Sequence, residues 1–239
     1  MRSFIVLLMA VVVSAVRAMR DLLMPRGCAG CDMPDQVLCS SCLDCFHQNQ
    51  VFRIYGYEWD FGYACGRYTG VLRKAILEWK DHGDLEVTRP LEMAMKDLIA
   101  AVCGRADQYC RSQILVVPVP SSLTSVRRRG RIHLMPIARS VALELQKLGY
   151  RACVKQILKL KDVKSKSVQL HGAAARSQRV NGRVQVCADR RITGCTVILV
   201  DDIITTGSTA SQCALALRKA NFHPLTLFTL ARAGIAIEE

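Results

Sequence analysis

The chain has 239 residues, of which 51% are hydrophobic and 22% are charged. This balance is typical of a globular protein with a sizeable core and excludes an intrinsically disordered chain. The formal net charge of +13 indicates polyanionic partners such as nucleic acid, phosphorylated small molecules or an anionic membrane face, and charge alone does not choose among them.

Residues 1–24 are predicted to be an apolar N-terminal helix or a misassigned extension of the true start. The apolar run from Phe4 to Val13 is too short to span a bilayer, although the composition imitates a signal peptide. A start at Met19 would lead directly into the cysteine-rich part of the chain. We therefore expect no transmembrane span, and a cytoplasmic protein that is either free or held at the inner face of the membrane.

Residues 25–50 are predicted to form a small zinc ribbon. Two C-x-x-C pairs lie seven residues apart, a spacing that can fold two turns around one tetrahedral ion. A redox-active C-x-x-C is the alternative, but that motif normally opens a helix after a strand and is not duplicated. Cys45 continues the series and could replace Cys42, and His47 is a weaker candidate. The predicted zinc ligands are Cys28, Cys31, Cys39 and Cys42.

Residues 51–239 are predicted to form one α/β domain. Alternating aromatic residues predict a hairpin over 51–67, and buried aliphatic runs predict strands that alternate with amphipathic helices. Such alternation is typical of a Rossmann-like parallel sheet flanked by helices. Helices are expected over 68–80, 88–102, 133–148 and 210–220, and strands over 114–120, 151–158, 183–186, 197–200 and 224–230.

A basic loop is expected after the strand over 114–120, which prolines end. Loops at the carboxyl ends of parallel strands bind ligands, and guanidinium groups suit a pyrophosphate. A run of charges is equally typical of a solvated surface loop, so both interpretations stay open. The candidate residues for pyrophosphate or DNA are Arg127, Arg128, Arg129 and Arg131.

The strand over 197–200 leads into two acids and a loop of small residues, V-I-L-V-D-D-I-I-T-T-G-S-T. We expect Asp201 and Asp202 to lie beyond the strand, where both carboxylates can accept the hydroxyls of one ribose. The short side chains of the loop allow backbone amides to converge on a phosphate at the positive end of the next helix. A helix cap followed by an ordinary turn is the alternative. The predicted phosphate loop consists of Thr205, Thr206, Gly207, Ser208 and Thr209.

This stretch resembles the motif with which type I phosphoribosyltransferases bind phosphoribosyl pyrophosphate (PRPP). The chain as a whole resembles the ComF family, phosphoribosyltransferase-like proteins linked to DNA uptake in competent bacteria. The resemblance rests on the cysteine pairs, on Y-x-G-x-L-R-x-x-I-L-x-W-K-x-x-G-D from Tyr68, on V-P-V-P before the arginines, and on L-V-D-D-I-I-T-T-G-S-T. The chain departs from the family after Gly130, where R-I-H stands in place of F-N-Q.

The resemblance implies a type I phosphoribosyltransferase-like fold in which Asp201 and Asp202 hold the ribose, the loop holds the 5′-phosphate, and Mg²⁺ accompanies PRPP. It implies transfer of the phosphoribosyl group to an acceptor that the sequence does not identify. The alternative is a non-catalytic module that keeps the fold and binds single-stranded DNA and a DNA-uptake or recombination protein. Residues 159–183 would form a mobile hood over PRPP, with candidate cationic residues Lys161, Lys164, Lys166, His171 and Arg176. A basic surface loop is the alternative for this segment.

Overall fold

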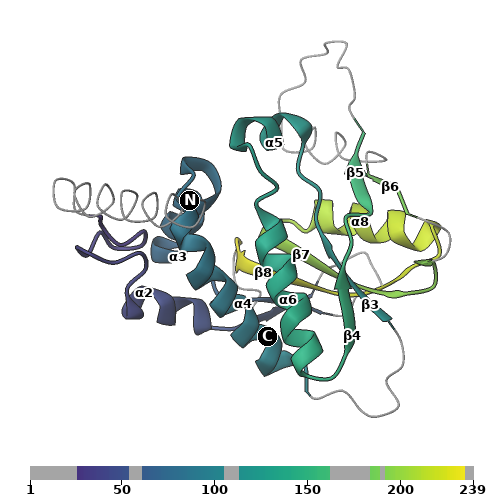
Figure 1. Ribbon diagram of the computed structural model, residues 1–239, viewed down its shortest axis with the longest axis horizontal. Coiled ribbons are helices and arrows are strands. Elements are labelled where there is room, and N and C mark those ends of the chain that lie inside the picture. The colour runs from purple at the N-terminus through teal and green to yellow at the C-terminus, as the bar shows by residue number, and fades with distance from the viewer. Residues whose placement is uncertain (1–25, 54–60, 105–112, 162–183, 189–191, 235–239) are drawn as a thin grey trace, which may run out of the picture.

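A computed structural model describes residues 26–53, 61–104, 113–161, 184–188 and 192–234 (Figure 1). The predictions for residues 1–24 and for the hood candidates Lys164, Lys166, His171 and Arg176 lie outside the described residues. Within them, helices flank a central sheet that is mostly parallel. The α/β fold class expected from the sequence is confirmed.

The described strands fall into two sheets. They are β1 Gln50–Phe52, β2 Gly62–Ala64, β3 Gln113–Pro118, β4 Arg151–Val154, β5 Leu158–Leu160, β6 Val184–Val186, β7 Thr196–Ile204 and β8 His223–Arg232. The central sheet has the order β1-β2-β8-β7-β3-β4, in which β1 and β2 pair antiparallel and all other neighbours pair parallel. β5 and β6 form a separate antiparallel ladder. Because β7 and β3 lie in the middle, their aliphatic runs are buried.

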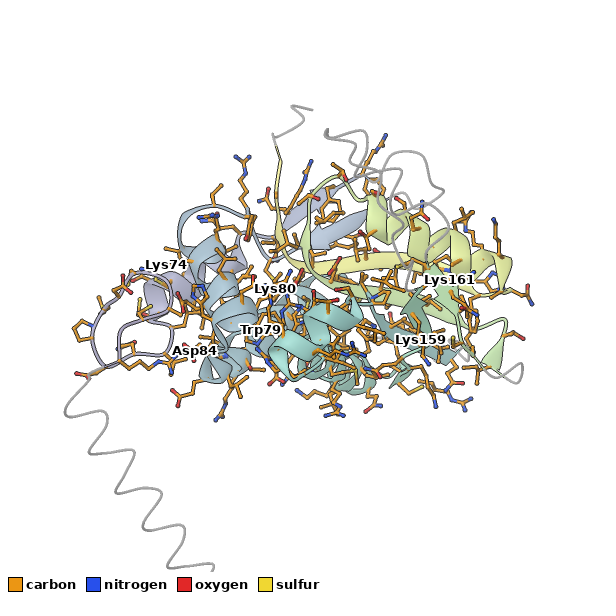
Figure 2. All side chains as sticks on the ribbon, turned by 90° about the horizontal axis from the view of Figure 1, so that it is seen from above. Lys74, Trp79, Lys80, Asp84, Lys159 and Lys161 are labelled. Carbon is orange, nitrogen blue, oxygen red and sulfur yellow. The ribbon has the colours of Figure 1, made fainter. Side chains whose placement is uncertain are left out.

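Helices cover both faces of the central sheet. They are α2 Ser40–Asp44, α3 Gly70–Leu77, α4 Thr88–Val102, α5 Leu123–Arg129, α6 Leu134–Lys147 and α8 Ser208–Lys219. Figures 1 and 2 show α6 and α8 on opposite faces, and α4 packs beside α6. α3 continues into a π-helical turn, Glu78–His82, which ends at Gly83 in the left-handed conformation with φ of 81°. None of the helices in the described part of the chain is both long and apolar enough to cross a membrane.

Three details differ from the expectations. The arginine-rich segment after β3 is the helix α5, because Ser122 Oγ caps it by accepting a hydrogen bond from the Ser125 amide at 3.1 Å. The segment 151–158 contains β4 and the start of β5, which belong to different sheets. β7 runs on to Ile204 because β8 continues to pair with it. Asp201 and Asp202 therefore lie within the strand and not beyond it.

Candidate functional site

The connection from β7 to α8 encloses a small cavity. β7 ends at Ile204, α8 begins at Ser208, and Gly207 between them takes the left-handed conformation at φ of 74°, which favours glycine. The cavity has a volume of about 50 Å³, well above the roughly 10–15 Å³ that one water needs. Its lining brings Asp201 together with all five predicted phosphate-loop residues, Thr205, Thr206, Gly207, Ser208 and Thr209.

This cavity has the chemistry of a phosphate site. The first amides of an α-helix have no acceptor within the helix, and the helix dipole makes that end positive. The α8 helix is 12 residues long, and its N-terminus faces the cavity through Ser208 and Thr209. The loop hydroxyls add further donors. An anion with several oxygens is the ligand that such a set of donors favours.

Asp202 faces a different environment from Asp201. Successive side chains of a strand point to opposite faces, so Asp202 points away from the loop cavity. Its Oδ2 lies 2.5 Å from Lys80 Nζ and 2.7 Å from His133 Nε2, and its Oδ1 accepts a hydrogen bond from the Ile203 amide at 2.7 Å. That both acids hold one ribose diol stays a prediction, and in this structure Lys80 and His133 occupy the Asp202 carboxylate. Asp201 is the acid that lines the cavity.

The hydrogen bonds of the buried His133 ring fix its tautomer. Arg129 Nη1 lies 3.3 Å from His133 Nδ1. Because a guanidinium group can only donate, Nδ1 must accept this hydrogen bond. The ring proton is then on Nε2, from which it is donated to the Asp202 carboxylate. His133 is thus a neutral link between Arg129 and Asp202.

The two acids differ in how readily they lose a proton. Burial alone would raise the pKa of Asp202, but the hydrogen bond from His133 and the charge of Lys80 outweigh it and hold this pKa well below its usual range. Partial burial and the negative charge of Asp202 raise the pKa of Asp201 well above its usual range. The pair therefore consists of a fixed, charged acid and a neighbour that is more readily protonated.

Three of the four predicted arginines contact other residues of the chain, and Arg128 does so through an exposed ion pair with Asp81 at 3.0 Å. The Arg129 side chain is 9% exposed and pairs with Asp81 at 3.0 Å. The Arg131 guanidinium lies 5.4 Å from the centre of the Trp79 ring and donates a hydrogen bond to the Trp79 carbonyl oxygen. The exposed members of the group are Arg127 and Arg128. A pyrophosphate or a nucleic acid could reach both, although Arg128 shares Asp81 with Arg129.

Sequence reasoning did not single out Lys80 or His133. Lys80 belongs to the W-K pair of the ComF-like motif, and His133 stands where the chain departs from that family. The motif and the departure from it draw attention to Lys80 and His133 in the sequence. Neither feature identifies Asp202 as their partner, because the contacts join distant parts of the chain. Of the hood candidates, Lys161 is described, and it is exposed directly after β5.

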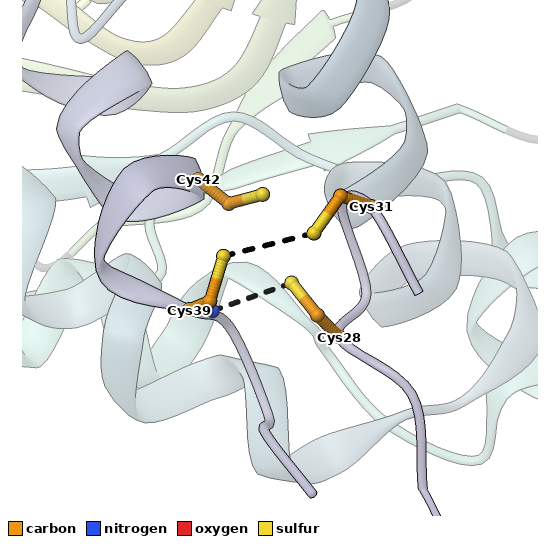
Figure 3. A group of neighbouring side chains, drawn as sticks. All are labelled: Cys28, Cys31, Cys39 and Cys42. Carbon is orange, nitrogen blue, oxygen red and sulfur yellow. Dashed lines mark hydrogen bonds between the residues drawn. The ribbon is translucent and has the colours of Figure 1, made fainter. Parts of the chain in front are cut away.

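The four predicted zinc ligands gather in one place (Figure 3). The Sγ atoms of Cys28, Cys31, Cys39 and Cys42 all lie within 4.8 Å of one another. The Sγ atoms of Cys31 and Cys39 are 3.7 Å apart. Zinc–sulfur bonds of about 2.3 Å in a tetrahedron separate two sulfurs by roughly 3.8 Å. The cluster therefore fits a zinc ion bound by four thiolates.

The surroundings of Cys28 suit a thiolate ligand, whereas burial and the neighbouring cysteines raise the pKa of Cys42. Burial raises the pKa of Cys28, but amide donors, including Gly30 at 3.4 Å and Cys39 at 3.3 Å from its Sγ, outweigh burial and lower this pKa to about 6. Cys45 points elsewhere and donates to the Ser41 carbonyl. His47, the other spare candidate, pairs with Asp97. The cysteine cluster is therefore made of the four residues that the spacing predicted.

No protein-family model matches the sequence, and no curated protein matches it either. Solved phosphoribosyltransferases are among the structures that resemble the chain. A hypoxanthine phosphoribosyltransferase from Staphylococcus aureus is 14% identical with a TM-score of 0.35, over 63% of this chain and 70% of that one. An adenine phosphoribosyltransferase from Saccharomyces cerevisiae is 13% identical with a TM-score of 0.37, over 81% and 89%. The UMP synthase of Leishmania donovani is 12% identical with a TM-score of 0.33, over 80% and 30%. Likenesses this distant carry no conclusion about activity.

Substitution of a cluster cysteine should release zinc. We expect one zinc ion in the purified protein and none in Cys39→Ser, because structural zinc needs its full ligand set and contributes on the order of 10 kcal/mol to a small module. Elemental analysis of the reduced protein measures the metal directly. Cys45→Ser is the matched control and should keep the ion, since this thiol lies outside the cluster. A metal-free wild-type protein whose residues 26–47 remain ordered in NMR spectra would contradict the prediction.

Acid should destabilise the fold through His133. Because burial lowers the pKa of His133 from its ordinary value of 6.5, the unfolded chain binds this proton more readily than the folded chain. The free energy of unfolding should therefore fall as the pH drops below 6.5, by at most about 1.4 kcal/mol for each pH unit. Urea unfolding over a pH series measures this slope. His133→Gln should flatten it. A slope in this variant equal to that of the wild type would refute the assignment.

Proposed function

We propose that the protein binds PRPP, or another ribose 5-phosphate compound, together with Mg²⁺ at the junction of β7 and α8. The observation that carries this proposal is the joint lining of one cavity by Asp201 and the predicted phosphate loop. A volume of about 50 Å³ suits a phosphate group and not a whole nucleotide. The ribose and pyrophosphate would therefore extend along the carboxyl edge of the sheet, where open α/β sheets bind their ligands.

Each part of PRPP would contact a different part of this site. The amides at the start of α8 would hold the 5′-phosphate, and Asp201 would accept a hydrogen bond from a ribose hydroxyl. Mg²⁺ would bind the oxygens of PRPP and supply charge neutralisation for the departing pyrophosphate. Arg128 on α5 follows the carboxyl end of β3, its side chain is 67% exposed, and it could donate to that pyrophosphate with the guanidinium nitrogens that do not contact Asp81.

We further propose a ComF-type phosphoribosyltransferase that works in the cytoplasm and contributes to DNA uptake. Two separate parts of the ComF-like pattern support this proposal, because the lysine of W-K and the second aspartate of D-D meet in the Lys80–Asp202 contact. The acceptor of the phosphoribosyl group would be identified by a screen of nucleobases and related amines for pyrophosphate release.

The second candidate is a non-catalytic module for single-stranded DNA. The net charge of +13 favours it. The contacts of Arg128, Arg129 and Arg131 with other residues of the chain count against it, because they occupy three of the four arginines of the predicted cluster. We therefore place PRPP binding first.

Calorimetric titration of the protein with PRPP and Mg²⁺ tests the proposal. At a pH where Asp201 is ionised, Asp201→Ala should weaken binding at least tenfold, because a hydrogen bond to a charged group contributes about 1.5–3 kcal/mol. Gly207→Val should abolish measurable binding, because a β-branched side chain blocks the approach of the phosphate and resists the positive φ at this position. Gly194→Val is the matched control, since Gly194 has φ of 82° but lies in the turn before β7.

The titration also separates the two candidates. If Gly194→Val binds PRPP like the wild type while Gly207→Val does not, backbone strain alone does not explain the loss. A wild-type protein that shows no heat of binding at millimolar PRPP, yet binds single-stranded DNA with an affinity that falls steeply with salt, would reject the first candidate in favour of the second.

A further inference from the structure

We propose that Lys80 is a positioning residue for the acid pair: its ammonium group holds Asp202 charged and in place, and Asp202 in turn orients Asp201 toward the ligand. This inference rests on the proposed function, because it assigns Lys80 to the same PRPP site. The contact is not a surface ion pair, since the side chain of Asp202 is 6% exposed and that of Lys80 is 21% exposed. Removing one partner of a buried pair leaves an uncompensated charge.

Lys80 supplies the positive charge next to Asp202. His133 also contacts this carboxylate, but its neutral ring donates a hydrogen bond without adding a charge. The guanidinium of Arg129 lies on the other side of the ring, where it pairs with Asp81. The charge of Asp202 is therefore balanced through Lys80, whose Nζ lies 2.5 Å from Oδ2.

A π-helical turn places Lys80 against β7. The α3 helix widens at Glu78, and π-helical turns of this kind are rare and occur frequently at functional sites. Trp79 anchors the turn: it is fully buried, its ring packs edge-on against His133 with centroids 5.2 Å apart, and its Nε1 donates to Thr88 Oγ1 at 3.0 Å. Figure 2 shows Trp79 and Lys80 next to one another toward the middle of the molecule. The anchored tryptophan limits where Lys80 can point.

The position of Asp202 affects Asp201 through the backbone of β7. The Asp202 amide donates to Asp201 Oδ1 at 2.8 Å, and the Ile203 amide donates to Asp202 Oδ1 at 2.7 Å. Both carboxyl groups are thus tied to the same short stretch of strand. Without the charge of Lys80, Asp202 would have to find another partner, and any shift of this stretch would move Asp201 relative to the loop cavity.

The test compares Lys80→Gln, Lys80→Arg and Lys74→Gln. Lys74 is the matched control, because it lies on α3, the helix that leads into the π-helical turn, and pairs with Asp32 in an exposed contact. Figure 2 shows Lys74 on the side of the N-terminal cysteine segment. Each variant is measured for the Kd of PRPP with Mg²⁺ by calorimetry and for the pH midpoint of His133 in nitrogen-15 NMR spectra.

We expect Lys80→Gln to weaken PRPP binding by about tenfold or more and to raise the pH midpoint of His133. The midpoint rises because the positive charge of Lys80 no longer opposes protonation of the ring, whereas the negative charge of Asp202 remains. Lys80→Arg should restore both quantities, and Lys74→Gln should change neither. A lysine with a purely structural role would affect thermal stability and leave the Kd of PRPP for the folded protein unchanged.

Wild-type affinity, or an unmoved His133 midpoint, in folded Lys80→Gln would overturn the inference and leave the proposed function standing. Failure of the wild type itself to bind PRPP would overturn both, and the His133 midpoints would still show whether Lys80 contacts the pair. If Lys80→Gln does not fold, Lys80→Arg decides alone. If folded Lys80→Arg binds PRPP within about threefold of the wild-type Kd, a positive charge at this position is what the site needs. A loss of about tenfold in folded Lys80→Arg refutes this.

Discussion

The structure depends on keeping one buried carboxylate charged. An ionised acid with 6% of its side chain exposed is stable only when it is paired and hydrogen-bonded, and Asp202 meets this requirement through Lys80, His133 and the Ile203 amide. These partners come from the π-helical turn, from the residue before α6 and from β7 itself. The contacts that stabilise the Asp202 carboxylate therefore fix these three elements relative to one another at the carboxyl edge of the sheet, where the loop cavity lies.

The cysteine loop holds the same segment on both sides of Lys80. Asp32 pairs with Lys74 before the π-helical turn, and Arg26 pairs with Asp84 after it. Cys28 and Cys31 lie between Arg26 and Asp32 in the chain, and Cys39 and Cys42 follow them. Because the Asp32–Lys74 pair is exposed and contributes little, a zinc ion that orders the loop would restrain the segment that carries Lys80 mainly through Arg26.

The sequence predicts what short-range patterns determine. Aliphatic runs predict β3 and β7, and amphipathic spacing predicts α4 and α6. The spacing of the cysteines predicts which four thiols cluster. Each of these signals is contained in a few neighbouring residues. The helix α5 does not follow from the sequence pattern, because a run of arginines is typical of a solvated loop and the cap at Ser122 is a single local signal. The Lys80–Asp202 contact could not be predicted, because only folding brings the two segments together. His133 occupies the position where the ComF resemblance expects glutamine. The residue at which the chain departs from that pattern is thus one that contacts Asp202.

The central claim is that two adjacent acids have different charge states, with Asp202 fixed as an anion and Asp201 left to meet the ligand. Carbon-13 NMR of the aspartate carboxyl groups over a pH titration tests it most directly, with Asp201→Asn and Asp202→Asn providing the assignments. The account predicts that Asp202 stays ionised below the ordinary aspartate pKa of 3.8 and that Asp201 takes up its proton well above that value. Two aspartates that titrate together near the ordinary value would contradict it.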